Sequence, residues 1–469
     1  MITDMDINRF ATHSLQDPRL LRILAAALEV VDPFKAVQKY LPSIEGRVYG
    51  LGIGKAAIPM MDALAEKMPL SGGLAITKFA SAPSRNLYTV LEGGHPIPDA
   101  RSVQAGQRVL EFVSSLEEND TLVCLISGGG SALVTAPYVP LEDLQTLTSL
   151  LLGSGARIDE INVLRRQLDR IKGGGLAGAT KAMIISLILS DVIGNPLEAI
   201  ASGPTVPDPT TKVDAMTILK KYELEKEVPK SIIQTLESRS VAVAPWRHLL
   251  LKTQEQALAL QSVQNIIIGD NKLAAQAARQ QAEQEGFQAE ILTNELQGEA
   301  SEVGRELAQR LRVDTSIRTR PFCLIAGGET TVTIRGHGKG GRNQEVALAA
   351  VEQMAGLQNV MLIALATDGD DGPTDAAGAV VTGESARRAE SLGLDAADYL
   401  SRNDAYPFFE ALGDLLKTGP TGTNVNDLIF LCHFSTSRKN LRKPENRGVR
   451  LRRTPLFSGI LPFREVLTK

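Results

Sequence analysis

The run at residues 183–189, Met-Ile-Ile-Ser-Leu-Ile-Leu, constrains the fold of this chain more than any other stretch. A short, almost uninterrupted apolar run predicts a strand that is buried on both faces. A second such run covers residues 121–126, and helical periodicity over 141–152 and 161–171 lies between the two. Strands that alternate with helices in this way predict an open, mostly parallel sheet with helices on both sides.

A chain of 469 residues is longer than one ordinary domain, and we expect two. The first, 1–255, is predicted to be a three-layer αβα domain. The second, 256–431, is predicted to be a further α/β domain with strands at 265–269, 322–326, 330–334 and 360–366 and helices at about 271–285, 299–312 and 344–354. In the first domain we expect helices at 18–40 and 56–68, a short strand that begins at residue 47 and breaks into glycines from residue 50, and a strand at 73–77.

Charge is distributed unevenly along the chain. The net charge is −4, but residues 432–469 contain ten Lys or Arg and two Asp or Glu, a balance of +8, which leaves −12 for residues 1–431. An acidic body argues against nucleic-acid binding. The composition of the 432–469 tail favours disorder over a packed element.

The sequence shows no pattern typical of disulfide or metal cross-links, of a signal peptide or of a membrane span. The three cysteines lack metal-ligand spacing, so a disulfide framework or structural zinc site is not expected. The N-terminus has no signal-peptide pattern, and no run of about 20 apolar residues occurs. We therefore expect a cytoplasmic protein without a membrane partner.

A glycine-rich segment at 50–55 follows the first predicted strand. It is one residue too short for a Walker A loop, and Ala56 stands where that loop needs a hydroxyl. Gly52 and Gly54 fit the GxGxxA dinucleotide pattern, but the next strand ends in Ile-Thr-Lys at 76–78, without the acid that would hold a ribose. A third interpretation places Lys55 at a helix N-terminus, where it and the backbone N–H groups would bind phosphate.

The segment 127–131 bears three consecutive glycines between two hydroxyls. Gly128, Gly129 and Gly130 leave backbone amides unshielded, and Ser127 and Ser131 flank them, which favours close approach of a polyphosphate. The alternative is a tight strand–helix turn. A serine-hydrolase triad with His95 is poorly supported, because no GxSxG elbow occurs.

Two carboxylates, Asp191 and Asp368, each follow a predicted strand beside flexible residues. Carboxylates in this position suit Mg²⁺, which takes one or two of them together with phosphate oxygens. Asp368 belongs to an acidic cluster with Asp370, Asp371 and Asp375, which does not fit an EF-hand. Taken singly, each acid also suits a turn or a cap.

The segment 335–345, Arg-Gly-His-Gly-Lys-Gly-Gly-Arg-Asn-Gln-Glu, joins a predicted strand to a predicted helix. Its glycines with Lys339 and Arg342 predict a mobile cationic loop for a polyanion, and a solvated hairpin is the alternative. His95, between glycines and prolines at 93–98, either contacts substrate or fixes a turn.

Several motifs taken together resemble the glycerate 2-kinase family. In the first domain these are Gly52-Ile-Gly-Lys55, Glu92-Gly-Gly-His-Pro-Ile-Pro-Asp99, Ile126-Ser-Gly-Gly-Gly-Ser-Ala132, Lys172-Gly-Gly-Gly-Leu176, Leu189-Ser-Asp-Val-Ile-Gly194 and Ala201-Ser-Gly-Pro-Thr205. In the second they are Ala326-Gly-Gly-Glu-Thr330, Gly338-Lys-Gly-Gly-Arg-Asn-Gln-Glu345, the segment 367–378, and Asn424-Val-Asn-Asp-Leu428. The resemblance covers about residues 15–431, in family order, and departs from the family in the tail.

The resemblance implies a Rossmann-like first domain, a second domain with a MOFRL region at about 322–431, and an active site in the cleft between them. It implies ATP-dependent phosphorylation of the 2-hydroxyl of D-glycerate. The family's catalytic lysine and arginine match Lys55 and Arg342. For the base we favour Asp191 over Asp368, and we expect either acid to bind Mg²⁺.

Other expectations follow from the motifs. We expect substrate contacts from His95, Asn343 and Glu345, and nucleotide phosphate contacts from the two first-domain glycine segments and Lys339. A homodimer is compatible with the sequence. Two alternatives remain, namely an NAD(P)-dependent hydroxypyruvate reductase, and a catalytically impaired member that acts as a binding protein through its basic tail.

Overall fold

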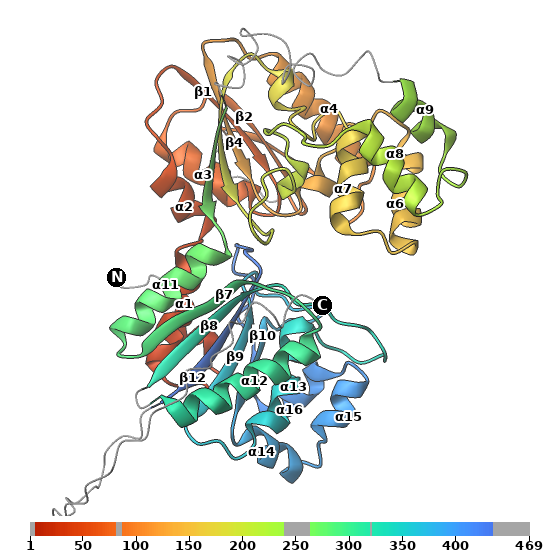
Figure 1. Cartoon of the computed structure of the whole chain (residues 1–469). Helices are drawn as coiled ribbons and strands as arrows, with labels where there is room; N and C mark the ends of the chain where they lie inside the picture. Colours follow the sequence, from red (N-terminus) through yellow and green to blue (C-terminus); the bar gives the residue numbers. More distant parts are fainter. Residues whose placement is uncertain (1–4, 81–86, 239–262, 319–320, 435–469) are drawn as a thin grey trace, which may run out of the picture. The chain divides into compact units, whose positions relative to one another are not determined.

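The computed structural model describes residues 5–80, 87–238, 263–318 and 321–434, and two six-stranded sheets carry the fold in these residues (Figure 1). The first sheet is parallel throughout and has the strand order β3-β2-β1-β4-β5-β6. Its strands are β1 (Arg47–Ile53), β2 (Gly72–Thr77), β3 (Thr89–Glu92), β4 (Asp120–Ile126), β5 (Met183–Leu189) and β6 (Val263–Gly269). The order reverses between β1 and β4, and the crevice at such a reversal is the usual ligand site of a parallel sheet.

Alternate residues of each central strand enter separate cores. In β4, Val123 and Leu125 pack with the helices of one face, whereas Leu122, Cys124 and Ile126 pack with those of the other. Burial on both faces explains why the sequence pattern is continuously apolar. The covering helices are α2 (Pro33–Tyr40) and α3 (Ala57–Lys67) on one face and α4 (Ala100–Ser114) with the short α5 (Gly130–Leu133) on the other.

A separate helical cluster follows β4 and β5 in the chain. Its apolar side chains form their own core, which includes Leu147, Leu164 and Ile232. The helices are α6 (Leu141–Gly153), α7 (Ile158–Gln167), α8 (Lys212–Lys221) and α9 (Lys230–Ser238), with the 3-10 turns η2 (Ala177–Ala179) and η3 (Ile200–Ser202) nearby in sequence.

The second sheet is mixed, with the order β11-β10-β9-β12-β8-β7. Only β7 and β8 pair in parallel, and the other described pairs are antiparallel. The strands are β7 (Gln288–Leu296), β8 (Phe322–Gly328), β9 (Val360–Ala366), β10 (Gly378–Thr382), β11 (Leu415–Leu416) and β12 (Asp427–His433). Cys323 and Cys432 face each other across β8 and β12 as free thiols, with sulfurs 3.6 Å apart.

Helices also cover both faces of the second sheet (Figure 1). The N-terminal helix α1 (Pro18–Glu29) packs beside α11 (Asn271–Gln284) on one face, after the 3-10 turn η1 (Ile7–Phe10). The other face bears α12 (Ala300–Ile317), α13 (Arg342–Met354), α14 (Ser385–Ser391), α15 (Ala396–Ser401) and α16 (Ala405–Leu412).

The predicted α/β class is confirmed, with two corrections to individual elements. The helix expected over 18–40 is two helices, because Asp32 caps the second and Pro33 opens it. The strand expected at 330–334 is wrong. Thr331 makes only an isolated bridge to Glu299, and Ile334 is 81% exposed, so β-branched residues without a partner strand do not form a sheet here.

Two elements pack with the sheet of the other predicted domain. The strand at Val263–Gly269, expected in the second domain, pairs with β5 in the first sheet, and α1 packs against the second sheet. The predicted boundary between residues 255 and 256 lies outside the described residues and stays a prediction. Of the predicted tail, Cys432 and His433 belong to β12, and residues 435–469 lie outside the described residues.

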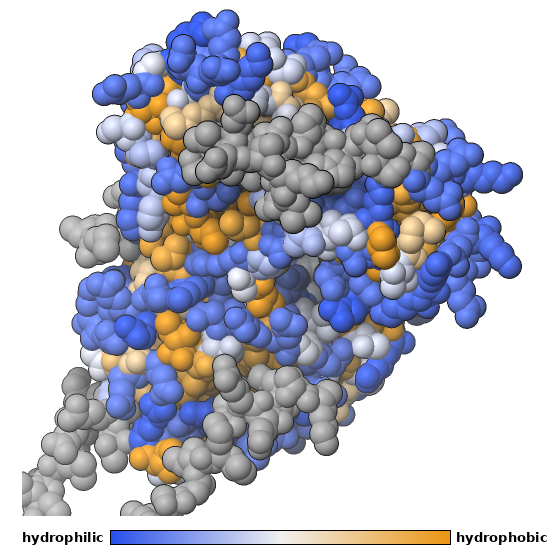
Figure 2. Space-filling model, turned by 45° about the horizontal axis from the view of Figure 1, so that its top comes forward, coloured by the Kyte–Doolittle hydropathy of each residue, from blue (hydrophilic) through white to orange (hydrophobic). Residues whose placement is uncertain are grey.

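Figure 2 shows hydrophobic residues interspersed with hydrophilic ones on the face that it draws. The large exposed hydrophobic side chains are spread over many elements, for example Phe79 after β2 and Ile158 at the start of α7. None of the helices in the described part of the chain is long and apolar enough to cross a membrane.

Candidate active site

The loops that follow β1 and β4 are tied together at the point where the strand order reverses. The Ser127 N–H donates to the Ile53 carbonyl (2.9 Å), and the Lys55 N–H donates to the Gly128 carbonyl (2.9 Å). The Ser127 hydroxyl, 1% exposed, accepts from the Ala56 N–H at the start of α3 (3.0 Å). The backbone of Lys55 is therefore fixed by hydrogen bonds, while its side chain is exposed.

The glycines of the second loop allow catalytic candidates to approach closely. A Cβ atom on Gly128 would lie 2.0 Å from Oδ2 of Asp191, and one on Gly129, whose φ is +85°, would lie 3.2 Å from Nε2 of His95 and 3.4 Å from Cγ of Lys55. Because these glycines have no side chain, Asp191, His95 and Lys55 can all lie close to one loop. This close approach supports a site here.

Other predicted phosphate ligands of this region have packing roles in the structure. Gly52 lies inside β1, where a Cβ would contact Met61 and Ala57 of α3. A Cβ at Gly130 would meet Ala201, and the Ser131 hydroxyl pairs with the Ser202 hydroxyl (2.9 Å). Phosphate binding by these residues and by Gly54 stays a prediction.

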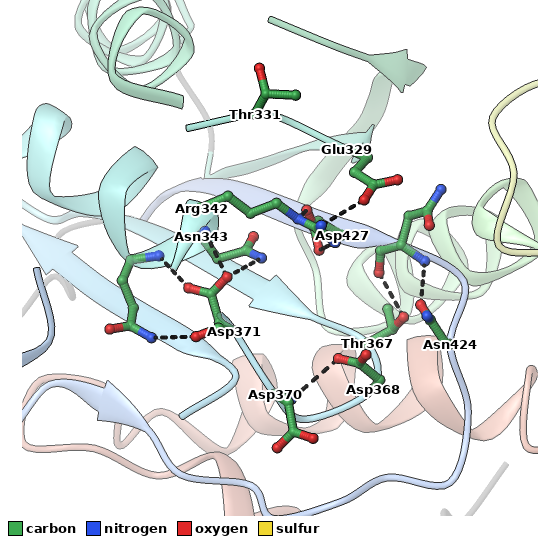
Figure 3. Close-up of polar contacts among 12 residues, drawn as sticks. Glu329, Thr331, Arg342, Asn343, Thr367, Asp368, Asp370, Asp371, Asn424 and Asp427 are labelled. Atoms are coloured by element: carbon green, nitrogen blue, oxygen red, sulfur yellow. Dashed lines mark hydrogen bonds and ion pairs between the residues drawn. The ribbon is translucent and has the colours of Figure 1, made fainter. Parts of the chain in front are cut away.

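Arg342, the first residue of α13, is held by two acids (Figure 3). Its Nε and Nη2 donate to the two carboxylate oxygens of Asp427 (2.6 and 3.0 Å), and its Nη1 donates to Oε1 of Glu329 (2.6 Å). Burial disfavours the charged guanidinium, but the hydrogen bonds and charge of Asp427 outweigh it and raise the Arg342 pKa. The bidentate pairing fixes the guanidinium plane at the site.

The N-terminus of α13 is already capped by a carboxylate. The Asp371 carboxylate accepts from the backbone N–H of Asn343 (3.1 Å) and from that of Gln344 (2.8 Å). Figure 3 labels Asp371 and Asn343. These amides are therefore not available to a phosphate, contrary to the interpretation of the 335–345 segment as a helix-end phosphate cradle. Asn343 is 1% exposed and also donates from its side chain to Asp371 (3.3 Å), so it supports the cap.

The acids of the site are shifted towards their neutral forms. Burial raises the pKa of Asp191 and of Asp368, and the Asp368 charge raises that of Asp191 further. Burial also raises the pKa of Glu329, and burial with the Asp427 charge raises that of Asp371 to about 7. Acids that repel one another in a partly desolvated site are stabilised by a bound cation.

His95 differs from these acids. Burial, together with the charges of Lys55 and Lys78, lowers its pKa to about 4. The imidazole is therefore neutral at neutral pH and suited to hydrogen bonding.

A cavity of about 810 Å³ brings together many of the predicted site residues. It is lined by Lys55, Asp191, Glu329, Thr330, Thr331, Val332, Ile334, Gly338, Gly340, Gly341, Arg342, Glu345, Asp368, Asp370, Asp371, Gly372, Pro373, Asn403, Asn424 and Asn426. Of the predicted residues, it unites Lys55, Asp191, Arg342, Glu345 and Asp368.

Lys339 does not line this cavity. Its Nζ lies 3.9 Å from the centre of the Tyr406 ring, and its N–H donates to Asp404 (2.8 Å). The side chain stacks on the ring of Tyr406 in α16, so a phosphate contact by Lys339 stays a prediction without structural support.

Sequence reasoning did not assign site roles to Glu329 and Asp427, and it considered Asp371 only as part of an acidic cluster for Mg²⁺. Glu329 and Asp427 stand inside quoted motifs, and Asp371 stands in an acidic cluster after β9. The sequence signal for such acids was Arg342 itself, because a cation at a buried helix start requires acidic partners.

The fold has a close match among solved structures. The crystal structure of glycerate kinase from Thermotoga maritima matches with a TM-score of 0.80 and 40% identity, covering 89% of this chain and 99% of that one. Among curated relatives, glycerate 2-kinase of Pyrococcus horikoshii is 40% identical over 431 residues, 87% of this chain and 96% of that protein. D-Glycerate 2-kinase of T. maritima is 41% identical over 430 residues, 88% and 99% of the two chains.

Two sequence families match separate parts of the chain. The family described as "Domain of unknown function (DUF4147)" matches residues 19–237, and the MOFRL family matches residues 322–427. The class is thus that of two-domain α/β proteins with the glycerate kinase fold. More narrowly, the chain belongs to the glycerate 2-kinase family, as its motifs predicted.

Proposed function

We propose that this protein is a kinase that transfers the γ-phosphoryl group of ATP to the 2-hydroxyl of D-glycerate, giving 2-phosphoglycerate and ADP. Family membership supports the reaction class. The observation that carries the proposal at the level of the site is the single cavity lined by Lys55, Asp191, Arg342 and Asp368. Phosphoryl transfer needs positioned cations and an acid or base at the acceptor hydroxyl, and these four side chains provide them.

In this proposal Lys55 binds the nucleotide phosphates. Its side chain is exposed and makes no ion pair with any residue in the described ranges, so its charge is available to a ligand. Arg342 stabilises charge on the transferring group from a fixed position, because Asp427 and Glu329 hold its guanidinium. A preorganised cation loses little free energy to reorganisation during the reaction.

Asp191 is our first choice for the base that accepts the 2-hydroxyl proton, with Asp368 second. Burial raises the Asp191 pKa, which brings a carboxylate closer to the strength required at neutral pH. His95 is proposed to bind a hydroxyl or carboxylate oxygen of the substrate as a neutral imidazole, since its pKa is lowered to about 4. Glu345, whose pKa is raised by burial, is proposed as a second hydrogen-bonding group for the substrate.

The site also fits Mg²⁺. No group of three or more His, Cys, Asp or Glu side chains among the described residues is arranged to hold a metal alone. Mg²⁺ in kinases uses one or two carboxylates and takes further oxygens from phosphate and water. Asp368, with Asp191 as the alternative, would supply the protein oxygen, and the ion would neutralise charge on the β- and γ-phosphates.

The proposal is tested by incubating the protein with D-glycerate and MgATP and separating 2- from 3-phosphoglycerate. Formation of 2-phosphoglycerate with an equal amount of ADP is expected. ATP hydrolysis without a phosphorylated acid, or 3-phosphoglycerate as the product, would be incompatible with the proposed function.

A reductase is the second candidate, because the strand order and the Gly52–Ala57 pattern are those of dinucleotide-binding sheets. Against it, β2 ends at Thr77 and is followed by Lys78, where a ribose-binding acid is required. NADH oxidation in the presence of hydroxypyruvate, with no kinase activity, would favour this candidate.

A further inference from the structure

Asn403 occupies an unusual position next to the catalytic cavity. It follows α15 with a φ of +56°, in the left-handed region that few residues other than glycine and asparagine adopt. Its side-chain oxygen accepts from the N–H groups of Arg335 (2.7 Å) and Gly336 (3.1 Å). Its side-chain nitrogen donates to the Thr333 carbonyl (3.2 Å) and to Oε2 of Glu345 (3.0 Å).

These four bonds use the full capacity of an amide, with two acceptor and two donor positions. Three of them hold the segment 333–336, and the fourth reaches the first turn of α13. One side chain therefore links the loop directly to the helix that bears Arg342.

The loop is also pressed against the backbone around Asn403. The Gly338 N–H donates to the Arg402 carbonyl (3.1 Å), and a Cβ at Gly338 would lie 2.5 Å from Cβ of Asp404. The Tyr406 N–H donates to the Lys339 carbonyl (2.9 Å). The glycines of this segment thus serve close backbone packing on residues 402–406, which differs from the mobile loop expected from the sequence.

Glu345 links the amide to the arginine. Its N–H donates to the Gly341 carbonyl (2.9 Å) in the turn that contains Arg342. The residue is 5% exposed, and its carboxylate accepts from the side-chain nitrogen of Asn403. Asn403 and Glu345 both line the catalytic cavity.

We propose that Asn403 is a positioning residue, which orders the segment 333–341 over the cavity and, through Glu345 and the first turn of α13, places Arg342 for phosphoryl transfer. This inference rests on the proposed kinase function. Asn403 itself transfers no proton and binds no phosphate.

The test replaces Asn403 by glycine, which accepts the left-handed φ and removes only the amide. Asn359→Gly is the matched control, since Asn359 has a φ of +57° and lies in the turn between α13 and β9. We expect Asn403→Gly to lower kcat about 10- to 100-fold, as a displacement of roughly 1 Å in a catalytic group does, while Asn359→Gly stays near wild type. Equal kcat in the two variants would overturn the proposal.

A second readout separates positioning from a general structural effect. If Asn403 acts through Arg342, the effects of Asn403→Gly and Arg342→Lys are not additive, and Asn403→Gly changes kcat less than about 3-fold in the Arg342→Lys background. Full additivity would contradict the coupling. Should Asn403→Gly not fold, Asn403→Asp decides, because it retains the acceptor oxygen and loses both donors, and a wild-type kcat would then overturn the role.

Trypsin cleavage provides a readout independent of catalysis. Arg335 and Lys339 are exposed cleavage sites within the segment that Asn403 orders. Faster cleavage at these two positions in Asn403→Gly than in Asn359→Gly is expected, and equal rates would refute the ordering. A wild type without kinase activity would refute the proposed function, whereas an active wild type with equal variants would refute only the role of Asn403.

Discussion

The two cationic loops of the site hold their charges in opposite ways. Lys55, after β1, is fixed through its backbone and has an exposed side chain with no ion pair in the described part of the chain. Arg342, at the start of α13, has its guanidinium bound to Asp427 and Glu329. The first loop offers a charge that is free for a ligand, whereas the second offers one whose direction is set before any ligand binds.

This difference separates catalysis from stability. Removing Lys55 should affect catalysis but not stability, because no ion pair in the described part of the chain is lost with it. Removing Arg342 should affect both, because the side chain of Asp427 is only 5% exposed and would be left without its cation.

The largest effects are expected from Lys55→Ala and Arg342→Ala, each of which should lower kcat roughly 10³-fold, as loss of a transition-state cation does. Arg342→Ala should also lower the free energy of unfolding by about 3 kcal/mol, since breaking a buried pair leaves an uncompensated charge. Steady-state kinetics and urea denaturation measure the two quantities. Equal stability of both variants would remove the contrast between the loops.

Much of the first loop could be predicted from its sequence, because local pattern determines it. Strand, glycines and helix follow one another in 47–67, and Lys55 stands at a position that the pattern fixes. The second loop was less predictable. Asp427 lies 85 residues from Arg342 in sequence, and the pair exists only because β12 inserts between β8 and β9.

The helix-end interpretation failed for the same reason. A glycine-rich start of α13 predicts free amides, but Asp371 reaches them from the loop after β9. Asn403 carried no sequence signal, since its role depends on four bonds to segments 58 to 70 residues away. Tertiary partners of this kind are not encoded in local spacing.

A smaller effect on kcat, about 10- to 100-fold, is expected from Gly128→Ala in the loop after β4, whose Gly128 carbonyl accepts from the Lys55 N–H. The added Cβ would lie 2.0 Å from the Asp191 carboxylate, so that carboxylate must move. Gly153→Ala, at the end of α6, is the matched control, because its Cβ has nothing within 4 Å. Similar kcat values for both variants would argue that the position of Asp191 is unimportant to catalysis.

Asp371, which caps the helix that begins at Arg342, should make the free energy of unfolding depend on pH. Its pKa in the folded protein is raised to about 7 from an ordinary value of 3.8, so the native state binds this proton more tightly than the unfolded state. The contribution to the free energy of unfolding is therefore present at low pH and is lost as the pH rises from about 4 through 7. In urea denaturation across this pH range, the free energy of unfolding should fall less steeply with pH in Asp371→Asn than in the wild type. An identical pH slope in both proteins would contradict the raised pKa of Asp371.

The smallest effect is expected from truncation after Phe434. β12 ends at His433 and pairs with β8 and β9 on its two edges, so both loops keep their supports. The 1–434 protein should match the full chain in kcat within about 2-fold and in its thermal midpoint. A truncated protein that gains activity would favour the interpretation of the full chain as an impaired member.

Lys55 and Arg342 are both proposed to serve phosphoryl transfer to the 2-hydroxyl of D-glycerate. ³¹P NMR of the full chain with D-glycerate and MgATP tests this proposal directly, because it identifies the phosphorylated position as the reaction proceeds. We expect the 2-phosphoglycerate resonance to grow as the ATP γ-phosphate resonance disappears, and this growth to be lost in Lys55→Ala and Arg342→Ala. Growth of 2-phosphoglycerate at the wild-type rate in both variants, or its absence in the wild type, would contradict the proposal.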